Sequence, residues 1–463
     1  MNQFINPVFI LQMAKSYLSD LDRVWNIDFK QLKKYQGKSL RKMVKYAYTV
    51  PLYKRKFKEN GIHFNDIQGI DDIRKLPFIT KNDLRENYPN DIVPLGYNKD
   101  NDFLLSTSGS TGKPVFVYCD MFSAIKRLEG FARVLKAYGG NWKNSKLMMI
   151  IDLSPGSVEH ATYIESAVPF LKRFMSLRNI RYLSIGEKPE KLIEEINQFQ
   201  PEFFGSDPNM LRKLAFLRNN GYGKKINPRF IFSAGSMLDI YTKKYVEKAF
   251  DAKVLDVYGS TEAGPMAFQC IENEYFHIQS DFVYLEFLDN NEEPVPFNSP
   301  GNLVVTRLYG MGTPIIRYKG IEDVIIPIEN KFSCGITTEM VKKIEGRSVD
   351  LISLPNGKTL SPLSLTGIPA KLMEEFNTYK IKQFQIIQHT LTDIEILIVI
   401  DEKLRNVGIP VEKLLNELQK RFSQKIENEV KVTVNETDEI QKDVRSDYVK
   451  VAISKVKKGK NLI

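Results

Sequence analysis

The sequence is poor in the two residue types that most often build cross-links and metal cages. Among 463 residues there are three cysteines, Cys119, Cys270 and Cys334, and four histidines. The cysteines are far apart, odd in number and without a CxxC pair, which favours a reducing cytoplasm over a disulfide framework. The histidines, at positions 63, 160, 277 and 389, are equally dispersed. Spacing alone therefore indicates no metal cage.

Long apolar runs are also missing. No stretch approaches the roughly 20 consecutive apolar residues that a membrane helix needs. The first residues lack a basic leader and a small-residue cleavage site, so we expect no signal peptide. Charged residues make up 26% of the chain, close to the average of soluble proteins. We therefore expect a cytoplasmic protein with no integral membrane segment.

Positive charge is in excess but is not concentrated. The net charge is +10, yet no element combines clustered basic residues with interleaved aromatics, and we expect no nucleic acid partner. The densest basic run lies between Lys450 and Lys460. A solvated tail and a contact with a polyphosphate such as coenzyme A are both open interpretations of this run.

The first two thirds of the chain predict a helical lead-in followed by an α/β sheet. Residues 1–100 show apolar side chains at helical spacing, with an interruption at Pro51 and a helix N-cap at Thr80 followed by Asp83. Beyond residue 100, short apolar runs such as KLMMIIDL, RFIFSAG and AKVLDVYG predict buried strands. Helical stretches lie between some of these strands, which argues for a largely parallel sheet with covered faces.

The remainder of the chain predicts two further parts. Residues 275–349 alternate apolar and polar side chains between glycines and prolines, and predict antiparallel strands or a small barrel that includes TPIIRY at 313–318. Residues 350–463 predict a small α+β module with an amphipathic helix. We therefore predict an α/β protein with a large, multi-sheet N-terminal domain over 1–349 and a small C-terminal domain over 350–463.

The densest chemical motif is LLSTSGSTGKPVFVY. Its eight central residues are Ser106, Thr107, Ser108, Gly109, Ser110, Thr111, Gly112 and Lys113. Small hydroxyls and glycines let backbone N–H groups approach an anion closely, and the lysine adds charge, so the composition predicts a phosphate cradle between two strands. It is not a Walker A loop, which would open a helix, because Pro114 and a strand-like run follow.

The second motif is VLDVYGSTEAGPM. A predicted buried strand ends at Tyr258 and Gly259, and Thr261 and Glu262 follow where the strand gives way to a loop. Ligands of α/β sheets bind at the carboxyl ends of strands. A glutamate aimed at a triphosphate normally holds Mg²⁺, since a carboxylate is otherwise repelled by phosphates, and Glu262 is the candidate metal ligand.

The two motifs together resemble those of the adenylate-forming superfamily of acyl-CoA synthetases, peptide-synthetase adenylation domains and luciferases. YAYTVPLYKRKFKENGI, LPFITKNDLRENYP, SDPNMLRKLA, FHIQSDFVYLEFLD and GTPIIRY make the chain more similar to the phenylacetate–coenzyme A ligase and CapK-like branch. The resemblance implies an ATP- and Mg²⁺-dependent enzyme that activates a small carboxylic acid as an acyl-AMP. It also implies a large adenylating domain with a small, mobile C-terminal lid, and a homodimer is common in this branch.

The resemblance also implies a role for each matching position. Residues Ser106 to Lys113 would wrap the β- and γ-phosphates of ATP, Glu262 would hold Mg²⁺ and Thr261 would touch the α-phosphate. Tyr258 would lie against the adenine with Gly259 beside it, and Gly235 and Ser236 would lie on the other side of the base. Asp323 would bind the ribose hydroxyls, and Arg347 would reach the ribose or a phosphate. Asp350 would lie at the hinge to the lid.

Three positions depart from the family pattern. Ser236 in SAGSM replaces an acidic residue. In RYKGIEDV two residues separate Gly320 from Asp323, so either the loop is longer or Glu322 shares the ribose role. The third departure concerns the lid.

The lid of the family normally presents a lysine in a Gly–Lys loop, which bridges carboxylate and phosphate during adenylation. The matching text, IQKDVRSDYVKVAISKV, has no Gly–Lys. Lys442 and Lys450 are the candidates, and Lys450 better fits the closing strand. Each is equally well explained as a solvated surface lysine.

Three functions remain open from the sequence. The first is acyl-AMP formation followed by transfer to coenzyme A. The second keeps adenylation but transfers the acyl group to an amine, a sugar or a carrier protein in cell-surface or secondary-metabolite synthesis. The third, motivated by the missing Gly–Lys, is a non-catalytic nucleotide-binding scaffold. The absence of a Ser–His–Asp or Cys–His arrangement is no objection to adenylation, which needs positioning and positive charge more than a protein nucleophile.

Overall fold

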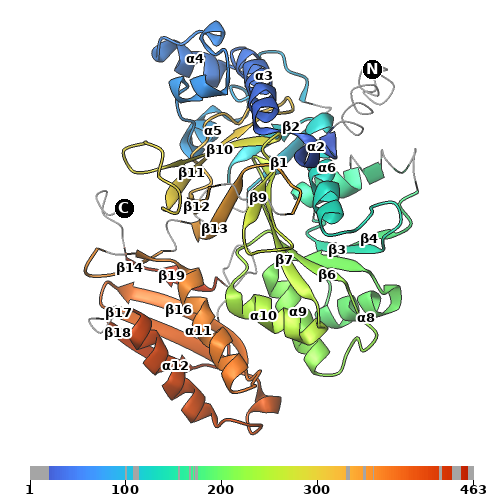
Figure 1. Ribbon diagram of the computed structural model, residues 1–463, viewed down its shortest axis with the longest axis vertical. Helices are drawn as coiled ribbons and strands as arrows, with labels where there is room; N and C mark the ends of the chain where they lie inside the picture. The colour runs from blue at the N-terminus through green and yellow to red at the C-terminus, as the bar shows by residue number, and fades with distance from the viewer. Residues whose placement is uncertain are drawn as a thin grey trace.

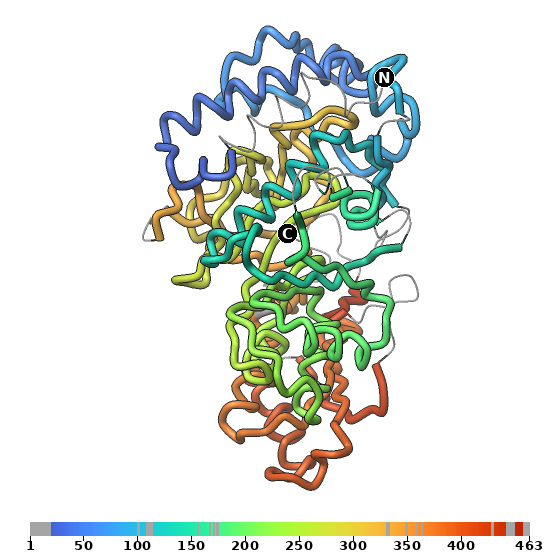
Figure 2. The backbone as a smooth tube through the Cα atoms, turned by 90° about the vertical axis from the view of Figure 1, so that its right-hand side faces the viewer, coloured from blue at the N-terminus to red at the C-terminus, as the bar shows by residue number. Residues whose placement is uncertain are grey.

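The computed structural model of the chain describes residues 20–99, 102–107, 114–154, 157–165, 168–169, 172, 176–329, 334–347, 351–357, 359–426, 430–440 and 450–456. They form an elongated molecule with N-terminal helices at one end, a large sheet in the middle and a C-terminal domain at the other end (Figures 1 and 2). Over these ranges, no helix is both long enough and apolar enough to cross a membrane.

The described part of residues 1–100 is mostly helical. It consists of α2 (Arg23–Asn26), α3 (Phe29–Ala47), α4 (Pro51–Glu59), α5 (Lys81–Asn87) and the short 3₁₀ helices η2 (Phe64–Asp66) and η3 (Ile70–Lys75). Pro51 is the first residue of α4, where its missing N–H costs nothing. Thr80 and Asp83 form the reciprocal capping box that begins α5.

The central sheet has eleven strands in the order β10-β11-β12-β13-β9-β8-β7-β6-β5-β3-β4. Its parallel part is β3 (Leu147–Ile151), β4 (Ile180–Ser184), β5 (Phe203–Ser206), β6 (Phe230–Ala234) and β7 (Lys253–Ser260). Its antiparallel part is β8 (Gly264–Gln269), β9 (Phe276–Ile278), β10 (Val283–Leu288), β11 (Gly301–Arg307), β12 (Asp323–Pro327) and β13 (Met340–Arg347). The predicted change from parallel to antiparallel pairing therefore occurs after β7.

Both faces of the parallel part are covered, as its continuous apolar strands predict. Val254 of β7 packs into the core beneath α8 (Pro189–Phe199), α9 (Pro208–Asn219) and α10 (Ile240–Phe250). Leu255 points to the opposite face and packs in the cluster that includes Val134 of α6 (Met121–Ala137). The fully buried Arg133 also joins α6 to the turn between β9 and β10 through two bonds to Asp281, of 2.8 and 3.0 Å.

The prediction of a strand at 313–318 is wrong. This segment forms isolated β-bridges at Tyr318 alone, to Val305 on one side and Ile79 on the other, and Ile315 adds a single backbone hydrogen bond from Arg307. Pro314 has no N–H to donate, and Arg317 adopts a positive φ of 45°, so a continuous ladder cannot form. Arg317 instead binds Glu286 through two bonds of 2.9 and 3.0 Å and anchors the segment in the interior.

The C-terminal domain is an α+β module, as predicted. A four-stranded sheet of order β18-β17-β16-β19 carries the helices α11 (Pro362–Glu375) and α12 (Val411–Ile426). Its strands are β16 (Ile381–Thr390), β17 (Asp393–Ile400), β18 (Lys431–Glu436) and β19 (Ala452–Ser454), preceded by the pair β14 (Ile352–Ser353) and β15 (Thr359–Leu360). Leu414, Leu418 and Phe422, spaced four residues apart, bury one face of α12.

The C-terminal domain packs against α10. The Tyr241 hydroxyl donates to the carbonyl oxygen of Ile381, and Lys244 pairs with Glu374 at 2.6 Å. Asp350, the expected hinge, lies outside the described residues. The division of the chain at residue 350 therefore stays a prediction.

We expect Asp102 to make the stability of the fold depend on pH. This side chain precedes the first strand, accepts a 2.6 Å hydrogen bond from the Tyr97 hydroxyl and is partly buried. Burial, with a smaller contribution from Asp120, raises its pKa from 3.8 to about 7. A raised pKa in the folded chain means that the unfolded chain binds fewer protons between pH 4 and 7, so stability falls as the pH rises through this window.

Asp102→Asn removes this ionisation. We expect it to raise the unfolding free energy by about 1–3 kcal/mol at pH 8, a range reduced for partial exposure, and by much less at pH 4. Urea denaturation at both pH values measures the difference. Asp438→Asn, at an exposed position, is the matched control. A gain that is equal at the two pH values would contradict the assignment.

Candidate active site

The phosphate-cradle motif forms the predicted hairpin. Strands β1 (Phe103–Ser106) and β2 (Phe116–Cys119) pair antiparallel, with Ser106 opposite Phe116. The neck is closed by Thr107, whose N–H donates to the carbonyl oxygen of Val115 at 3.0 Å and whose hydroxyl accepts from the Val115 N–H at 2.9 Å. The tip, from Ser108 to Lys113, lies outside the described residues.

The adenine-side residues lie at the carboxyl ends of the parallel strands β6 and β7. Gly235 follows β6 with a φ of +88°, which a glycine adopts without strain. Apart from its two chain neighbours, no described residue has an atom within 4 Å of where its Cβ would be. The hydroxyl of Ser236 is buried and makes no hydrogen bond with the described part of the chain. Tyr258 and Gly259 lie on the neighbouring strand β7. These four residues lie at neighbouring strand ends, the position where α/β sheets bind ligands, and we call this position the crevice.

Asp323 and Arg347 join this crevice from two other strands. The Tyr258 hydroxyl donates to Asp323 Oδ2 at 2.5 Å. Asp323 begins β12, and its backbone partner in the antiparallel ladder is Arg347, the last residue of β13. A Cβ on the adjacent Gly346 would lie 2.9 Å from the Met237 sulfur, so the end of β13 is close to the loop that carries Gly235 and Ser236. Residues separated by more than a hundred positions thus meet around one crevice.

Glu262 is held on both its side chain and its backbone. The residue is 4% exposed, and its carboxylate accepts a 2.9 Å bond at Oε1 from the Tyr318 hydroxyl. Its carbonyl oxygen accepts a 3.0 Å bond from Arg307. The carbonyl oxygen of Thr261 accepts from Arg127 of α6 at 2.6 Å. Two arginines therefore fix the backbone of the turn between β7 and β8, and Tyr318 fixes one carboxylate oxygen.

Arg307 connects this turn to the phosphate-cradle hairpin. The guanidinium is fully buried and also donates to the carbonyl oxygen of Thr313 at 2.7 Å. Thr313 in turn makes two 3.0 Å hydrogen bonds with the backbone of Tyr118 in β2. The two sequence motifs are thus linked through one buried cation. Our sequence reasoning missed Arg307, Arg127 and Tyr318, although GTPIIRY, which contains Thr313 and Tyr318, was among the segments that carry the family resemblance.

The remaining predicted positions are Glu322, Lys450 and Lys442. Glu322 forms a 2.6 Å ion pair with Lys81 of α5, whereas its neighbour Asp323 contacts Tyr258. Lys450 lies in the C-terminal domain just before β19, and its carbonyl oxygen accepts a 2.8 Å bond from Gln385 of β16. Lys442 lies outside the described residues.

The chain is similar to known proteins over most of its length. The chain is 24% identical over 427 residues to the phenylacetate–coenzyme A ligase of Thermus thermophilus, and the alignment covers 88% of this chain and 92% of that protein. It is 23% identical over 376 residues to protein CapK of Staphylococcus aureus, with 80% and 78% covered. No protein-family model matches the chain.

The fold is also found among solved structures. A 2-hydroxyisobutyryl-CoA ligase, solved in its postadenylation state in complex with 2-HIB-AMP, superposes with a TM-score of 0.76 at 20% identity. The superposition covers 93% of this chain and 91% of the other. The comparisons thus confirm the predicted resemblance to the adenylate-forming superfamily, on the branch of the phenylacetate–coenzyme A ligases and CapK, and the expectation of an adenylate-forming ligase.

Proposed function

We propose that this chain activates a small carboxylic acid with ATP as an acyl-AMP and then transfers the acyl group to coenzyme A. The observation that carries the proposal is the linkage of the two motifs through Arg307, which joins the Glu262 turn to Thr313 and the cradle hairpin. A nucleotide with its adenine at Tyr258 and its phosphates at the cradle would extend between the Glu262 turn and the cradle hairpin, which Arg307 links. The relatives named CoA ligases support the same reaction class.

Each group around the crevice has a proposed role. Ser106, Thr107 and the loop that follows bind the β- and γ-phosphates, and Thr261 contacts the α-phosphate. The base lies between Gly235–Ser236 and Tyr258–Gly259. The buried Ser236 hydroxyl, which has no hydrogen-bond partner among the described residues, is available there to a base edge. Asp323 accepts hydrogen bonds from the ribose hydroxyls, and Arg347 provides positive charge next to them.

Glu262 is suited to hold Mg²⁺. Mg²⁺ prefers oxygen ligands, and it is usually bound through one or two carboxylates together with substrate phosphates. Tyr318 occupies Oε1, while Oε2 makes no hydrogen bond with the described residues, so one carboxylate oxygen can coordinate an ion. Bound there, Mg²⁺ would supply positive charge against the phosphate oxygens.

The reaction requires placement more than a protein nucleophile. A carboxylate oxygen of the acid attacks the α-phosphorus, the bond to the bridging oxygen of the β-phosphate breaks, and pyrophosphate leaves. Two anions must approach, so fixed donors and cations lower the barrier. In the second half-reaction the coenzyme A thiolate attacks the acyl carbonyl carbon and AMP leaves. Arg127, Arg307 and Tyr318 contribute by holding the Glu262 turn in one geometry.

The proposal is tested by acid-dependent pyrophosphate release with aryl, fatty and amino acids, with and without coenzyme A. We expect release with at least one acid and a thioester only when coenzyme A is present. Acylation of an added amine, sugar or carrier protein in place of coenzyme A would assign the other acceptor. ATP binding without release for any acid, in a folded protein, would favour the scaffold function.

We expect Asp323→Ala to weaken ATP binding. Loss of the ribose-side carboxylate should raise the Michaelis constant for ATP about tenfold, which corresponds to about 1.4 kcal/mol. Tyr258→Phe, which keeps Asp323 but removes the 2.5 Å hydrogen bond to it, should raise this constant only about threefold. Glu322→Ala is the matched control, because Glu322 is paired with Lys81. A larger effect at Glu322 than at Asp323 would move the ribose role to Glu322.

A further inference from the structure

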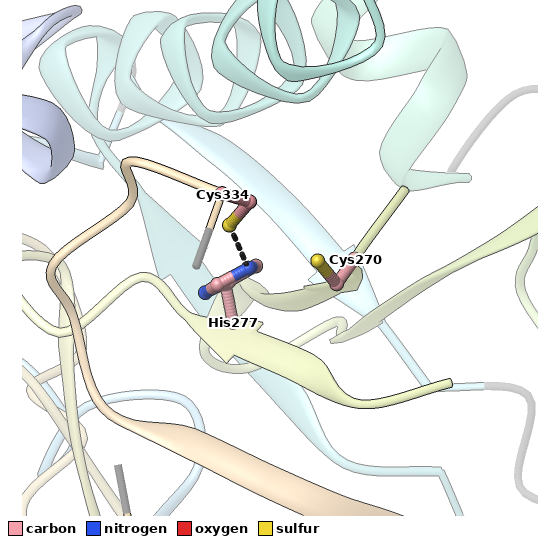
Figure 3. Close-up of side chains that lie close together, drawn as sticks. All are labelled: Cys270, His277 and Cys334. Carbon is pink, nitrogen blue, oxygen red and sulfur yellow. Dashed lines mark hydrogen bonds between the residues drawn. The ribbon is translucent and has the colours of Figure 1, made fainter. Parts of the chain in front are cut away.

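Three side chains that are far apart in sequence converge away from the crevice. Cys270 directly follows β8, His277 lies in β9, and Cys334 belongs to the segment between β12 and β13. Their sulfur and ring-nitrogen atoms all lie within 4.8 Å of one another. Figure 3 shows both sulfur atoms turned towards the same edge of the His277 ring. The fold therefore gathers two of the three cysteines and one of the four histidines of the chain at one place.

The pairing of the strands fixes these positions. His277 lies opposite Phe268 of β8 and Met340 of β13, so it stands in the interior of the sheet between two paired strands. The N–H of Cys270 donates to the carbonyl oxygen of Tyr275 at 2.7 Å and closes the β8–β9 hairpin. Two of the three side chains are thus presented by one hairpin and the third by a separate segment.

The apolar residues around this cluster do not explain why a histidine is buried at position 277. Ile328 and Met340 pack with Cys270, and a buried cysteine alone would be an ordinary small apolar residue there. His277, however, is 0% exposed and its Nδ1 makes no hydrogen bond with the described residues. Within the described part of the chain, Nε2 has one hydrogen-bond partner, the Cys334 sulfur, at 3.1 Å. A fully buried imidazole with so little compensation is costly unless something else binds it.

We propose that Cys270, His277 and Cys334 bind a zinc ion. Tetrahedral zinc, with Zn–S of about 2.3 Å and Zn–N of about 2.0 Å, separates its ligand atoms by roughly 3.5–4 Å. This separation falls between the 3.1 Å that joins Cys334 to His277 and the 4.8 Å within which all three ligand atoms lie. Thiolate and imidazole ligands together favour Zn²⁺ over Mg²⁺ or Ca²⁺, which prefer oxygen. The described residues supply three ligands, and the fourth position is left to water.

The ion has a structural role in this proposal. Strand β8 continues from the turn that carries Thr261 and Glu262, and β13 ends at Arg347. A metal bound by Cys270, His277 and Cys334 would tie the β8–β9 hairpin to the segment leading into β13. Zinc would therefore hold together two strands that bring groups to the crevice, without contacting the nucleotide.

The first test is the metal content of untagged, full-length protein purified under reducing conditions. We expect about one zinc ion per chain in the wild type and less than about one tenth in Cys270→Ala and Cys334→Ala. Cys119→Ala is the matched control, since Cys119 is also buried but lies in β2. Equal zinc in all variants would indicate adventitious binding and overturn the proposal.

A second test does not depend on the folding of variants. Wild-type protein stripped by a chelator is titrated with Co²⁺, and thiolate coordination should produce a charge-transfer band that zinc then removes. The stripped protein should also unfold at a lower temperature, and added zinc should restore it. A wild type that binds neither metal, or in which Cys270 and Cys334 are joined as a disulfide after purification with reductant, would contradict the site.

Discussion

Replacing Glu262 by glutamine should reduce acid-dependent pyrophosphate release by at least about 100-fold in a protein that remains folded. The substitution keeps the volume of the side chain and an oxygen that can accept from Tyr318, but it removes the negative charge. Its backbone bond to Arg307 is also unaffected. The expected loss therefore reports the carboxylate itself and not the collapse of the turn. Initial rates at saturating ATP and several Mg²⁺ concentrations provide the measurement.

Tyr318→Phe tests the contribution of the hydrogen bond that orients the Glu262 carboxylate. The variant keeps the charge of Glu262 but loses the 2.9 Å hydrogen bond that orients it. We expect a fall of about three- to tenfold, with a shift of the Mg²⁺ dependence to higher concentration. Glu322→Gln, which alters an acidic residue paired with Lys81, should change the rate by less than about twofold. A Glu262→Gln enzyme with more than a tenth of wild-type activity would remove Glu262 from the proposed mechanism.

Local sequence patterns predicted the parts of the fold that depend on neighbouring residues. The capping residues Thr80 and Asp83 marked the start of α5, and the apolar residues on both sides of the cradle motif predicted the β1–β2 hairpin. The short apolar run of β7 indicated a buried strand, and the structure places Val254 and Leu255 in clusters on opposite sides. In each case the determining interactions lie within one turn or one strand, where spacing alone is informative.

Contacts between distant segments could not be predicted in this way. TPIIRY alternates like a strand, but its backbone is instead fixed by Tyr318 and by the buried pair between Arg317 and Glu286. Arg307 lies in β11, and its role depends on a contact with the distant Glu262 turn that the local sequence does not indicate. The Cys270, His277 and Cys334 grouping has no spacing signature, because the pairing of β9 with β8 and β13 brings its members together.

Lys450→Ala should lower pyrophosphate release by about 100-fold while leaving the second half-reaction nearly unchanged. The parallel pairing of β19 with β16 and the bond from Gln385 to its carbonyl oxygen fix the backbone at this position. We infer that a lysine held there is better suited to bridge carboxylate and phosphate than Lys442. Because the lysine would act only on the approach of two anions, it should not affect attack of coenzyme A on the finished adenylate.

The two half-reactions are therefore measured separately. Acid and ATP supply the first assay, and preformed acyl-AMP with coenzyme A supplies the second. Lys455→Ala is the matched control, because Lys455 lies on the same segment and contacts His389 at 3.3 Å. A loss of adenylation in Lys442→Ala with full activity in Lys450→Ala would transfer the role to Lys442. Full adenylation in both variants would mean that the departure from the family's Gly–Lys pattern is real, and that positive charge at the acid and the α-phosphate comes from the large domain alone.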